Sequence, residues 1–231
     1  MYGYYDSSYL LYMVISLAVS FYAQIKVKRA FGKYSKIKCS ENITGKQSAQ
    51  KVLEHHSVSG VPIGRITGYF TDHFDSRTNK ISLSENVHDK SSIAAISVAA
   101  HEAGHAVQNE KGYIPLKIRQ FLVPITQIGS NLAMPLVFIG LLLPVRYSFV
   151  VNFGIILYSL AVLFQIITLP VEFDASRRAF ESLKNTKTIE KHEEEGIKAV
   201  LSAAAFTYIV ATFTALLSLL RLIFIARRRR D

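Results

Sequence analysis

The residues best suited to chemistry are two histidines four positions apart with a glutamate between them. They are His101, Glu102 and His105, in the pattern H-E-x-x-H. On an α-helix, positions i and i+4 share one face with about 6 Å between their side-chain bases, so both imidazoles can bind one Zn²⁺. Glu102 is offset around the helix, where it can take a proton from a water that the metal activates. The pattern therefore predicts a hydrolytic zinc site with one ion per chain.

The surroundings of this pattern strengthen the prediction. The segment SSIAAISVAAHEAGHAVQ is otherwise apolar, and Ser91 or Ser92 can cap it as a helix. Charged and imidazole groups are costly to bury in such a helix without a metal or other partners. The single cysteine, Cys39, excludes a disulfide framework and a thiolate zinc cluster, so the ligands must come from His, Asp and Glu.

A catalytic zinc usually has three protein ligands and one open position for water, so a third ligand is expected. Glu172 and Asp174 follow an apolar stretch, and two residues apart on a helix they point to different faces, so only one is expected to reach the metal. Alternatively, these carboxylates favour the start of a helix after Pro170. The full set of candidates is Glu172, Asp174, Glu181, His73, His88 and Glu110.

Four apolar segments are long enough to cross a bilayer as helices, at about 8–25, 121–143, 148–169 and 200–225. A short turn at 144–147 joins the second and third, which predicts a transmembrane hairpin. Pro124 and Pro135 predict a kink in the second helix. The expected fold class is a mainly α integral membrane protein with about four transmembrane helices and a small α+β extramembrane domain.

The polar segment between the first two spans is the candidate extramembrane domain. Thr44 is expected to cap a helix that ends near His56. Alternating residues in 61–70 and 79–84 predict a β-hairpin ahead of the H-E-x-x-H helix. The strand Lys80–Ser84, with Ile81, Ser82 and Leu83, is a candidate edge for an extended substrate, or else a buried structural strand.

These predictions give an order of segments along the chain. We expect an N-terminal anchor in 1–25, the zinc-binding peptidase domain in 26–120, a transmembrane hairpin in 121–169, a helical segment with the third ligand in 170–199, and a fourth apolar segment with a basic tail in 200–231.

The charge distribution is typical of a membrane protein. The net charge is +10, and basic residues cluster in 26–38 and 227–230, each directly after an apolar stretch. No nucleic-acid-binding motif accompanies them. The larger basic set places 26–120 in the cytoplasm. Four complete spans would then leave Arg227–Arg230 outside, so either the last segment does not fully cross or the charge rule fails here.

Three segments in this order among the apolar spans resemble a known family. TDHFDSRTNKISLS, SVAAHEAGHAVQ and LPVEFDASRRA are similar to the YugP-like family of neutral zinc metallopeptidases of bacterial membranes. A more distant resemblance joins them to the HtpX and CAAX prenyl endopeptidases, in which the Glu of the later motif is the third ligand. The resemblance implies this role for Glu172. That distant group has Asp where this chain has Ser176, so Asp174 is expected to orient a ligand histidine instead.

The expected function is that of a membrane-bound zinc endopeptidase. His101, His105 and Glu172 bind the metal, and Glu102 is the general base. Arg177 and Tyr113 are candidates to stabilise the oxyanion, or else a salt-bridging residue and an aromatic anchor. The expected partners are the lipid bilayer and a protein or peptide substrate in or near the membrane; the oligomeric state is not specified.

The main alternative is a non-catalytic membrane scaffold or adaptor with a structural zinc. Glu102 argues against it, because a structural site has no use for a general base and usually closes all four metal positions. A carrier is a weaker alternative still, since the middle of the apolar spans holds no ionisable residue.

Overall fold

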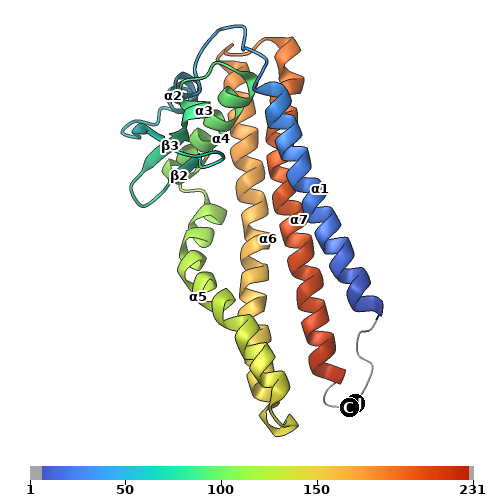
Figure 1. Cartoon of the computed structure of the whole chain (residues 1–231). Helices are drawn as coiled ribbons and strands as arrows, with labels where there is room; N and C mark the ends of the chain where they lie inside the picture. Colours follow the sequence, from blue (N-terminus) through green and yellow to red (C-terminus); the bar gives the residue numbers. More distant parts are fainter. Residues whose placement is uncertain (1–6, 229–231) are drawn as a thin grey trace. The chain divides into compact units, whose positions relative to one another are not determined.

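The computed structural model describes residues 7–228 of the chain and confirms a mainly α fold with a small sheet (Figure 1). Residues 1–6 of the expected anchor and 229–231 of the expected basic tail lie outside the described part. The elements are α1 (Ser7–Tyr34), α2 (Gly45–His55), β1 (Ile63–Ile66), β2 (His73–Asp75), β3 (Lys80–Ser84), α3 (Glu85–His88), α4 (Ile93–Glu110), α5 (Ile114–Leu142), η1 (Val145–Tyr147), α6 (Ser148–Asn185), η2 (Lys191–Glu193) and α7 (Glu194–Arg228).

The chain divides into two compact units. A unit built of long helices, here called the helical unit, comprises the described residues within Met1–Phe21, Lys117–Leu169 and Tyr208–Asp231. The other, here called the mixed unit, comprises Tyr22–Leu116 and Pro170–Thr207, and contains the sheet. The segment expected at 170–199 therefore packs in the same unit as the segment expected at 26–120.

Within the described residues, four helices are long and apolar enough to cross a membrane, as expected. They are Leu10–Tyr34, Ile114–Leu142, Val145–Asn185 and Lys191–Arg228. In the helical unit, α5 and α6 form a hairpin through η1. Gly154 allows their close approach, because a Cβ there would lie 2.9 Å from the carbonyl oxygen of Ala133. The helix α5 runs through Pro124 and Pro135 and bends along its length (Figure 1).

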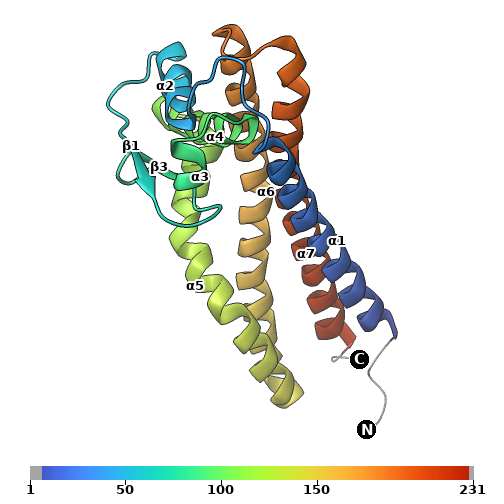
Figure 2. The ribbon, with the colours of Figure 1, turned by 45° about the horizontal axis from the view of Figure 1, so that its top comes forward.

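The sheet of the mixed unit has the order β1-β3-β2. The turn at 76–79 joins β2 to β3 as an antiparallel hairpin, whereas β1 runs parallel to β3. The predicted hairpin between 61–70 and 79–84 is therefore wrong: the earlier segment does supply a strand beside β3, but this strand is parallel to β3, and the short strand His73–Asp75 forms the hairpin instead. Figure 2 shows α3 beside β1 and β3.

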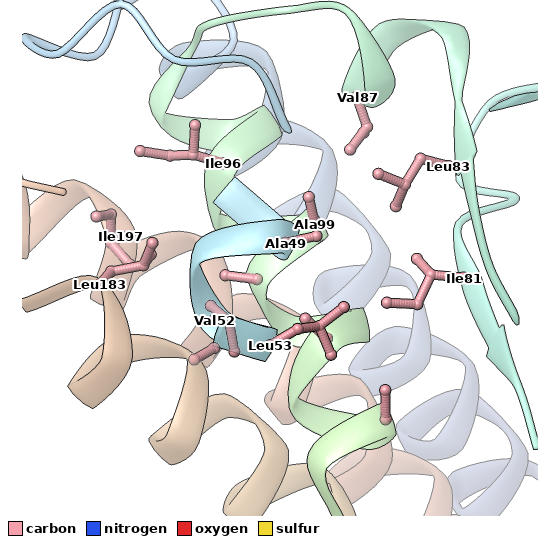
Figure 3. Packing of buried hydrophobic residues seen from close by; sticks show 14 of the residues in the cluster. Ala49, Val52, Leu53, Ile81, Leu83, Val87, Ile96, Ala99, Leu183 and Ile197 are labelled. Atoms are coloured by element: carbon pink, nitrogen blue, oxygen red, sulfur yellow. The ribbon is translucent and has the colours of Figure 1, made fainter. Parts of the chain in front are cut away.

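Helices α2 and α4 pack on each other and form the core of the mixed unit with β3 (Figure 3). The Thr44 side chain accepts the Gln47 backbone N–H, and the Gln47 side chain accepts the Thr44 N–H, so the predicted cap is confirmed as a capping box. Ser92 caps α4 by accepting the N–H of Ala95. The side chains that fill the core include Val52, Leu53, Ile81, Leu83, Val87, Ile96, Leu183 and Ile197.

The helix α6 continues through Pro170 without ending. Residues 170–185 of this helix belong to the mixed unit, and Ala175, Ala179 and Leu183 along it are completely buried. The alternative that Glu172 and Asp174 stand at the start of a helix after Pro170 is therefore wrong, because the helix begins at Ser148. Both carboxylates instead lie within one turn, well inside the helix.

Candidate metal centre

The helix α4 supplies the two histidines of the candidate site. Its fourteen buried residues include Glu102 and His105, and His101 is partly buried. The imidazole rings of His101 and His105 have centroids 4.7 Å apart and stand at 81° to each other. The four-residue spacing therefore places both rings side by side, as the sequence predicted.

Glu172 of α6 completes this group. Its Oε2 lies 3.3 Å from Nε2 of His101 and 3.6 Å from Nε2 of His105, and its side chain is 2% exposed. Among the described residues, these three form the one group of at least three His, Cys, Asp or Glu ligand atoms that lie within 4.8 Å of one another. A buried carboxylate facing two imidazoles is costly without a cation to neutralise it.

A close contact between helices α4 and α6 brings Glu172 to the histidines. A Cβ at Gly104 would lie 2.5 Å from the carbonyl oxygen of Ala175, so only glycine fits at this position of the H-E-x-x-H pattern. Ala175 lies three residues after Glu172 on α6. The packing of Gly104 against α6 therefore fixes how near the carboxylate comes to His101 and His105.

Gln108, which the sequence analysis did not single out, orients His105. Its amide nitrogen donates to the carbonyl oxygen of Val171 at 2.8 Å and to Oδ2 of Asp174 at 2.9 Å. Its Oε1 lies 3.0 Å from Nδ1 of His105, and because the amide oxygen only accepts, Nδ1 carries the hydrogen. This tautomer leaves the Nε2 lone pair of His105 to bind a metal.

Ser176 orients the other histidine. Its hydroxyl oxygen lies 3.1 Å from Nδ1 of His101, one helical turn beyond Glu172. The residue that contacts His101 is thus a serine, whereas the HtpX and CAAX prenyl endopeptidases have Asp at this position. Asp174, the expected substitute, reaches His105 only through Gln108, and it also accepts hydrogen bonds from Arg177 and from Arg178.

Glu102 is held by the sheet rather than by the metal group. Its Oε2 accepts the backbone N–H of Phe74 in β2 at 2.9 Å, and the residue is 9% exposed. Burial raises the pKa of the Glu102 carboxyl above its ordinary value, and nearby Glu172 and Asp72 raise it further. A cation bound beside it would lower this pKa again. Strand β2, which the sequence analysis did not predict, thus fixes the expected general base.

The expected substrate strand does not have a free edge. Strand β3 pairs with β1 along Ile81–Ser84 and with β2 along Lys80–Ser82, and Ile81 and Leu83 are completely buried. The prediction that a substrate adds to Ile81, Ser82 and Leu83 is therefore wrong, and the alternative of a buried structural strand is confirmed. Strand order cannot be read from the alternation of side chains.

The two candidate oxyanion donors have other partners. Arg177 pairs with Asp174 and, at 3.0 Å, with Glu181 on the same helix. The Tyr113 hydroxyl donates to the carbonyl oxygen of Pro170 at 3.5 Å. Their oxyanion role stays a prediction.

Besides Asp174, four candidates for the third ligand lie outside the metal group, namely Glu181, His73, His88 and Glu110. Nδ1 of His73 is within hydrogen-bond distance of the carbonyl oxygen of Thr71, at 2.7 Å, and His88 pairs with Asp89 at 2.6 Å. Glu181 is engaged by Arg177, and Glu110 is exposed at the end of α4.

Comparison with known proteins identifies relatives of the chain. The sequence profile of the family described as "Putative neutral zinc metallopeptidase" matches residues 9–227. The chain is 42% identical over 223 residues to "Putative membrane protease YugP" of Bacillus subtilis (strain 168), and this match covers 96% of the chain and 98% of that protein. No solved structure gives a significant match.

Proposed function

The chain belongs to this neutral zinc metallopeptidase family, and we propose that it is a membrane-bound zinc endopeptidase whose centre is formed by His101, Glu102, His105 and Glu172. One observation carries the proposal. Nε2 of His101, Nε2 of His105 and a buried oxygen of Glu172 meet within 4.8 Å, beside a second buried carboxylate that is hydrogen-bonded to a strand.

The donor set suits zinc. Two ligands that each lie about 2.0–2.1 Å from a tetrahedral ion are about 3.3–3.4 Å apart. The separations of Glu172 Oε2 from the two Nε2 atoms, 3.3 and 3.6 Å, are close to this value. The hydrogen bond from His105 to Gln108 favours the tautomer that leaves Nε2 for the metal. Three protein ligands leave a fourth position, as in catalytic rather than structural sites.

Zinc bound by these three residues would acidify a water and polarise the peptide carbonyl. Glu102 would accept the proton of that water and then donate it to the leaving amine. The Phe74 N–H occupies Oε2 of Glu102, which leaves Oε1 to carry the proton. The same hydrogen bond fixes the carboxylate orientation, so that little reorganisation is needed when the proton moves.

The strand β2 is the best candidate to bind the substrate backbone. Within the described sheet it lies at one edge, and it contacts α4. An extended peptide along its outer side would run past Phe74, whose N–H holds Glu102. The order β1-β3-β2 thus moves the proposed substrate edge from β3 to β2.

Substrates in or near the membrane are the favoured class. Glu172 lies three residues beyond Leu169, on the same continuous helix as the third apolar segment. At about 1.5 Å per residue, this is only about 4–5 Å along the helix axis. We also place this centre on the cytoplasmic side, since most basic residues near the ends of the apolar segments fall in 26–120 and 170–199.

Metal content of the purified protein tests the ligand assignment. Full-length protein in detergent is expected to hold about one zinc per chain, and His105→Ala and Glu172→Gln are each expected to lose most of it. Glu181→Gln is the matched control, because Glu181 is an exposed carboxylate of the same helix that pairs with Arg177. Full zinc retention by Glu172→Gln would exclude Glu172 as the third ligand.

Cleavage of an unfolded membrane-protein substrate tests the activity itself. The wild-type protein is expected to cleave it, and a zinc chelator is expected to stop the cleavage. Zinc binding without cleavage of any substrate offered would favour the adaptor instead.

A further inference from the structure

The mixed unit exposes a small set of large apolar side chains. Four of them lie on or close to the long helices. Tyr22, Ile114 and Phe173 are on helices that also contribute to the helical unit, and Ile37 lies three residues after the end of α1. Tyr69 and Phe70 are different, because they lie on the loop 67–71 between β1 and β2. Tyr69 is 76% exposed and Phe70 is 54% exposed. Two adjacent aromatic residues at a loop tip are costly to leave in water and usually mark an interaction site.

The backbone of this loop is held in one conformation. The Thr71 hydroxyl donates to the carbonyl oxygen of Thr67 at 3.2 Å, and Asp72 accepts the Ser84 N–H at 2.7 Å. Phe70 has a φ of 57°, which bulky residues rarely adopt. A strained conformation that displays an aromatic pair persists only where the surrounding contacts fix it.

The contact that fixes Phe70 lies on α1. The rings of Phe70 and Phe31 meet edge to face with centroids 5.0 Å apart. Phe31 follows Ile25, the last apolar residue before Lys26, by six positions on one continuous helix, or about 9 Å along its axis. The headgroup region adds about 5–8 Å to each side of the hydrocarbon core. If the first apolar segment spans the bilayer, the loop tip therefore touches α1 at the outer boundary of the headgroup region.

The charges on this stretch of α1 complement a lipid surface. Lys28, Arg29 and Lys33 are exposed there, on the turns that include Phe31. Basic side chains beside exposed aromatic rings are typical of the interface between a membrane and water, and anionic headgroups attract such basic clusters. A peptide substrate would not require this set of positive charges.

We propose that the loop 67–71 inserts Tyr69 and Phe70 among the lipid headgroups beside the basic residues of α1. The loop leads directly into β2, and Phe74 lies four residues after Phe70. The lipid contact would therefore keep β2, and the Glu102 that its backbone binds, next to the bilayer surface. Only this last consequence rests on the proposed function; the lipid contact does not.

Tryptophan fluorescence tests the contact directly, because the chain has no tryptophan of its own. Tyr69→Trp would be made as the sole tryptophan in the full chain and reconstituted into vesicles of phosphatidylcholine and phosphatidylglycerol. Quenching by lipids brominated on the acyl chain near the headgroup is compared with quenching by aqueous acrylamide. Tyr22→Trp, on the first apolar helix, is the positive control.

His192→Trp is the matched negative control. His192 is an exposed aromatic residue like Tyr69, but it lies among the acidic residues Glu190, Glu193 and Glu194. Acidic surroundings disfavour contact with anionic headgroups.

The expected result is that brominated lipid quenches the tryptophan at position 69 at least about two-fold more than the one at position 192, with weaker quenching by acrylamide. Full quenching by acrylamide with none by brominated lipid would overturn the proposal. Shielding from both quenchers would also overturn it, because protein would then cover the loop. The proposal would also be overturned if the tryptophan became shielded from acrylamide only after an unfolded peptide substrate is added. The loop would then contact substrate and not lipid.

Discussion

The Nδ1 atom of His105 lies 3.0 Å from Oε1 of Gln108, and the same amide group binds α6 through Val171 and Asp174. One fully buried side chain therefore orients a proposed zinc ligand and joins the two helices that supply the ligands. Three groups depend on it, because its removal leaves the His105 ring, the Val171 carbonyl and the Asp174 carboxylate without this partner.

Replacing this amide is expected to weaken zinc binding. Gln108→Leu keeps a similar volume but removes the acceptor for His105, and loss of such an outer partner typically lowers metal affinity by about 10–100-fold. Competition with a chromophoric chelator measures the affinity. Gln50→Leu is the control, because Gln50 is an exposed glutamine that contacts Glu54 on α2. Equal affinities for the two variants would exclude the orienting role.

Ser176 is expected to act on His101 in the same way. Ser176→Ala removes the hydroxyl that lies 3.1 Å from Nδ1 of His101, so zinc affinity is expected to fall by about ten-fold. Ser176→Asp, which introduces the residue of the distant endopeptidases, is expected to retain it. Ser202→Ala on α7 is the control, since its hydroxyl contacts only its own helix backbone. A Ser176→Ala protein with wild-type affinity would contradict the assignment.

Gly104 is expected to tolerate no side chain. Gly104→Ala places a Cβ 2.5 Å from the Ala175 carbonyl oxygen, and overpacking of this kind costs about 1–3 kcal/mol. The helices must separate, so both the unfolding temperature and the zinc content are expected to fall. Gly32→Ala in α1 is the control, because nothing lies within 4 Å of its added Cβ. A stable Gly104→Ala protein with full zinc would show that this contact does not position Glu172.

The histidine at the C-terminal end of α2 is expected to make stability depend on pH. Burial lowers the pKa of His56, and the neighbouring His55, Arg178 and Lys111 lower it further. The unfolded chain therefore binds a proton at a higher pH than the folded chain, and stability is lost as the pH falls below about 6.5.

Thermal unfolding of metal-stripped protein measures this dependence without the contribution of metal release. His56→Gln should lose less stability than the wild-type protein between about pH 7 and pH 5.5. His192→Gln, at an exposed histidine that does not act on His56, serves as the control. An unchanged pH dependence in His56→Gln would remove His56 as the cause.

The sequence revealed the parts of this site that lie close together along the chain. His101, Glu102 and His105 follow from helix periodicity, because their relation is local. Glu172 lies 67 residues after His105, and its role came from a family resemblance. The role of Gln108, three positions after His105, became visible only in the structure. A glutamine near the end of a helix is usually exposed, but Gln108 is fully buried.

The sheet shows a different limit of sequence analysis. The alternation in Lys80–Ser84 correctly predicted a strand, but side-chain alternation does not reveal which strands are neighbours. The three-residue strand β2 is too short to give a periodic signal, yet it forms the sheet edge and binds Glu102. The proposed substrate edge and the hydrogen-bond partner of the general base could therefore be identified only from the structure.

Comparison of the wild-type protein with Glu102→Gln tests the central claim most directly. Glutamine keeps the shape of the side chain and can still accept the Phe74 N–H, but it cannot take up a proton. Zinc content and cleavage of an unfolded membrane-protein substrate would be measured side by side on detergent-purified full-length protein. We expect equal zinc in both proteins, chelator-sensitive cleavage by the wild type and none by Glu102→Gln. Cleavage by Glu102→Gln at the wild-type rate would contradict the assignment of Glu102 as the general base.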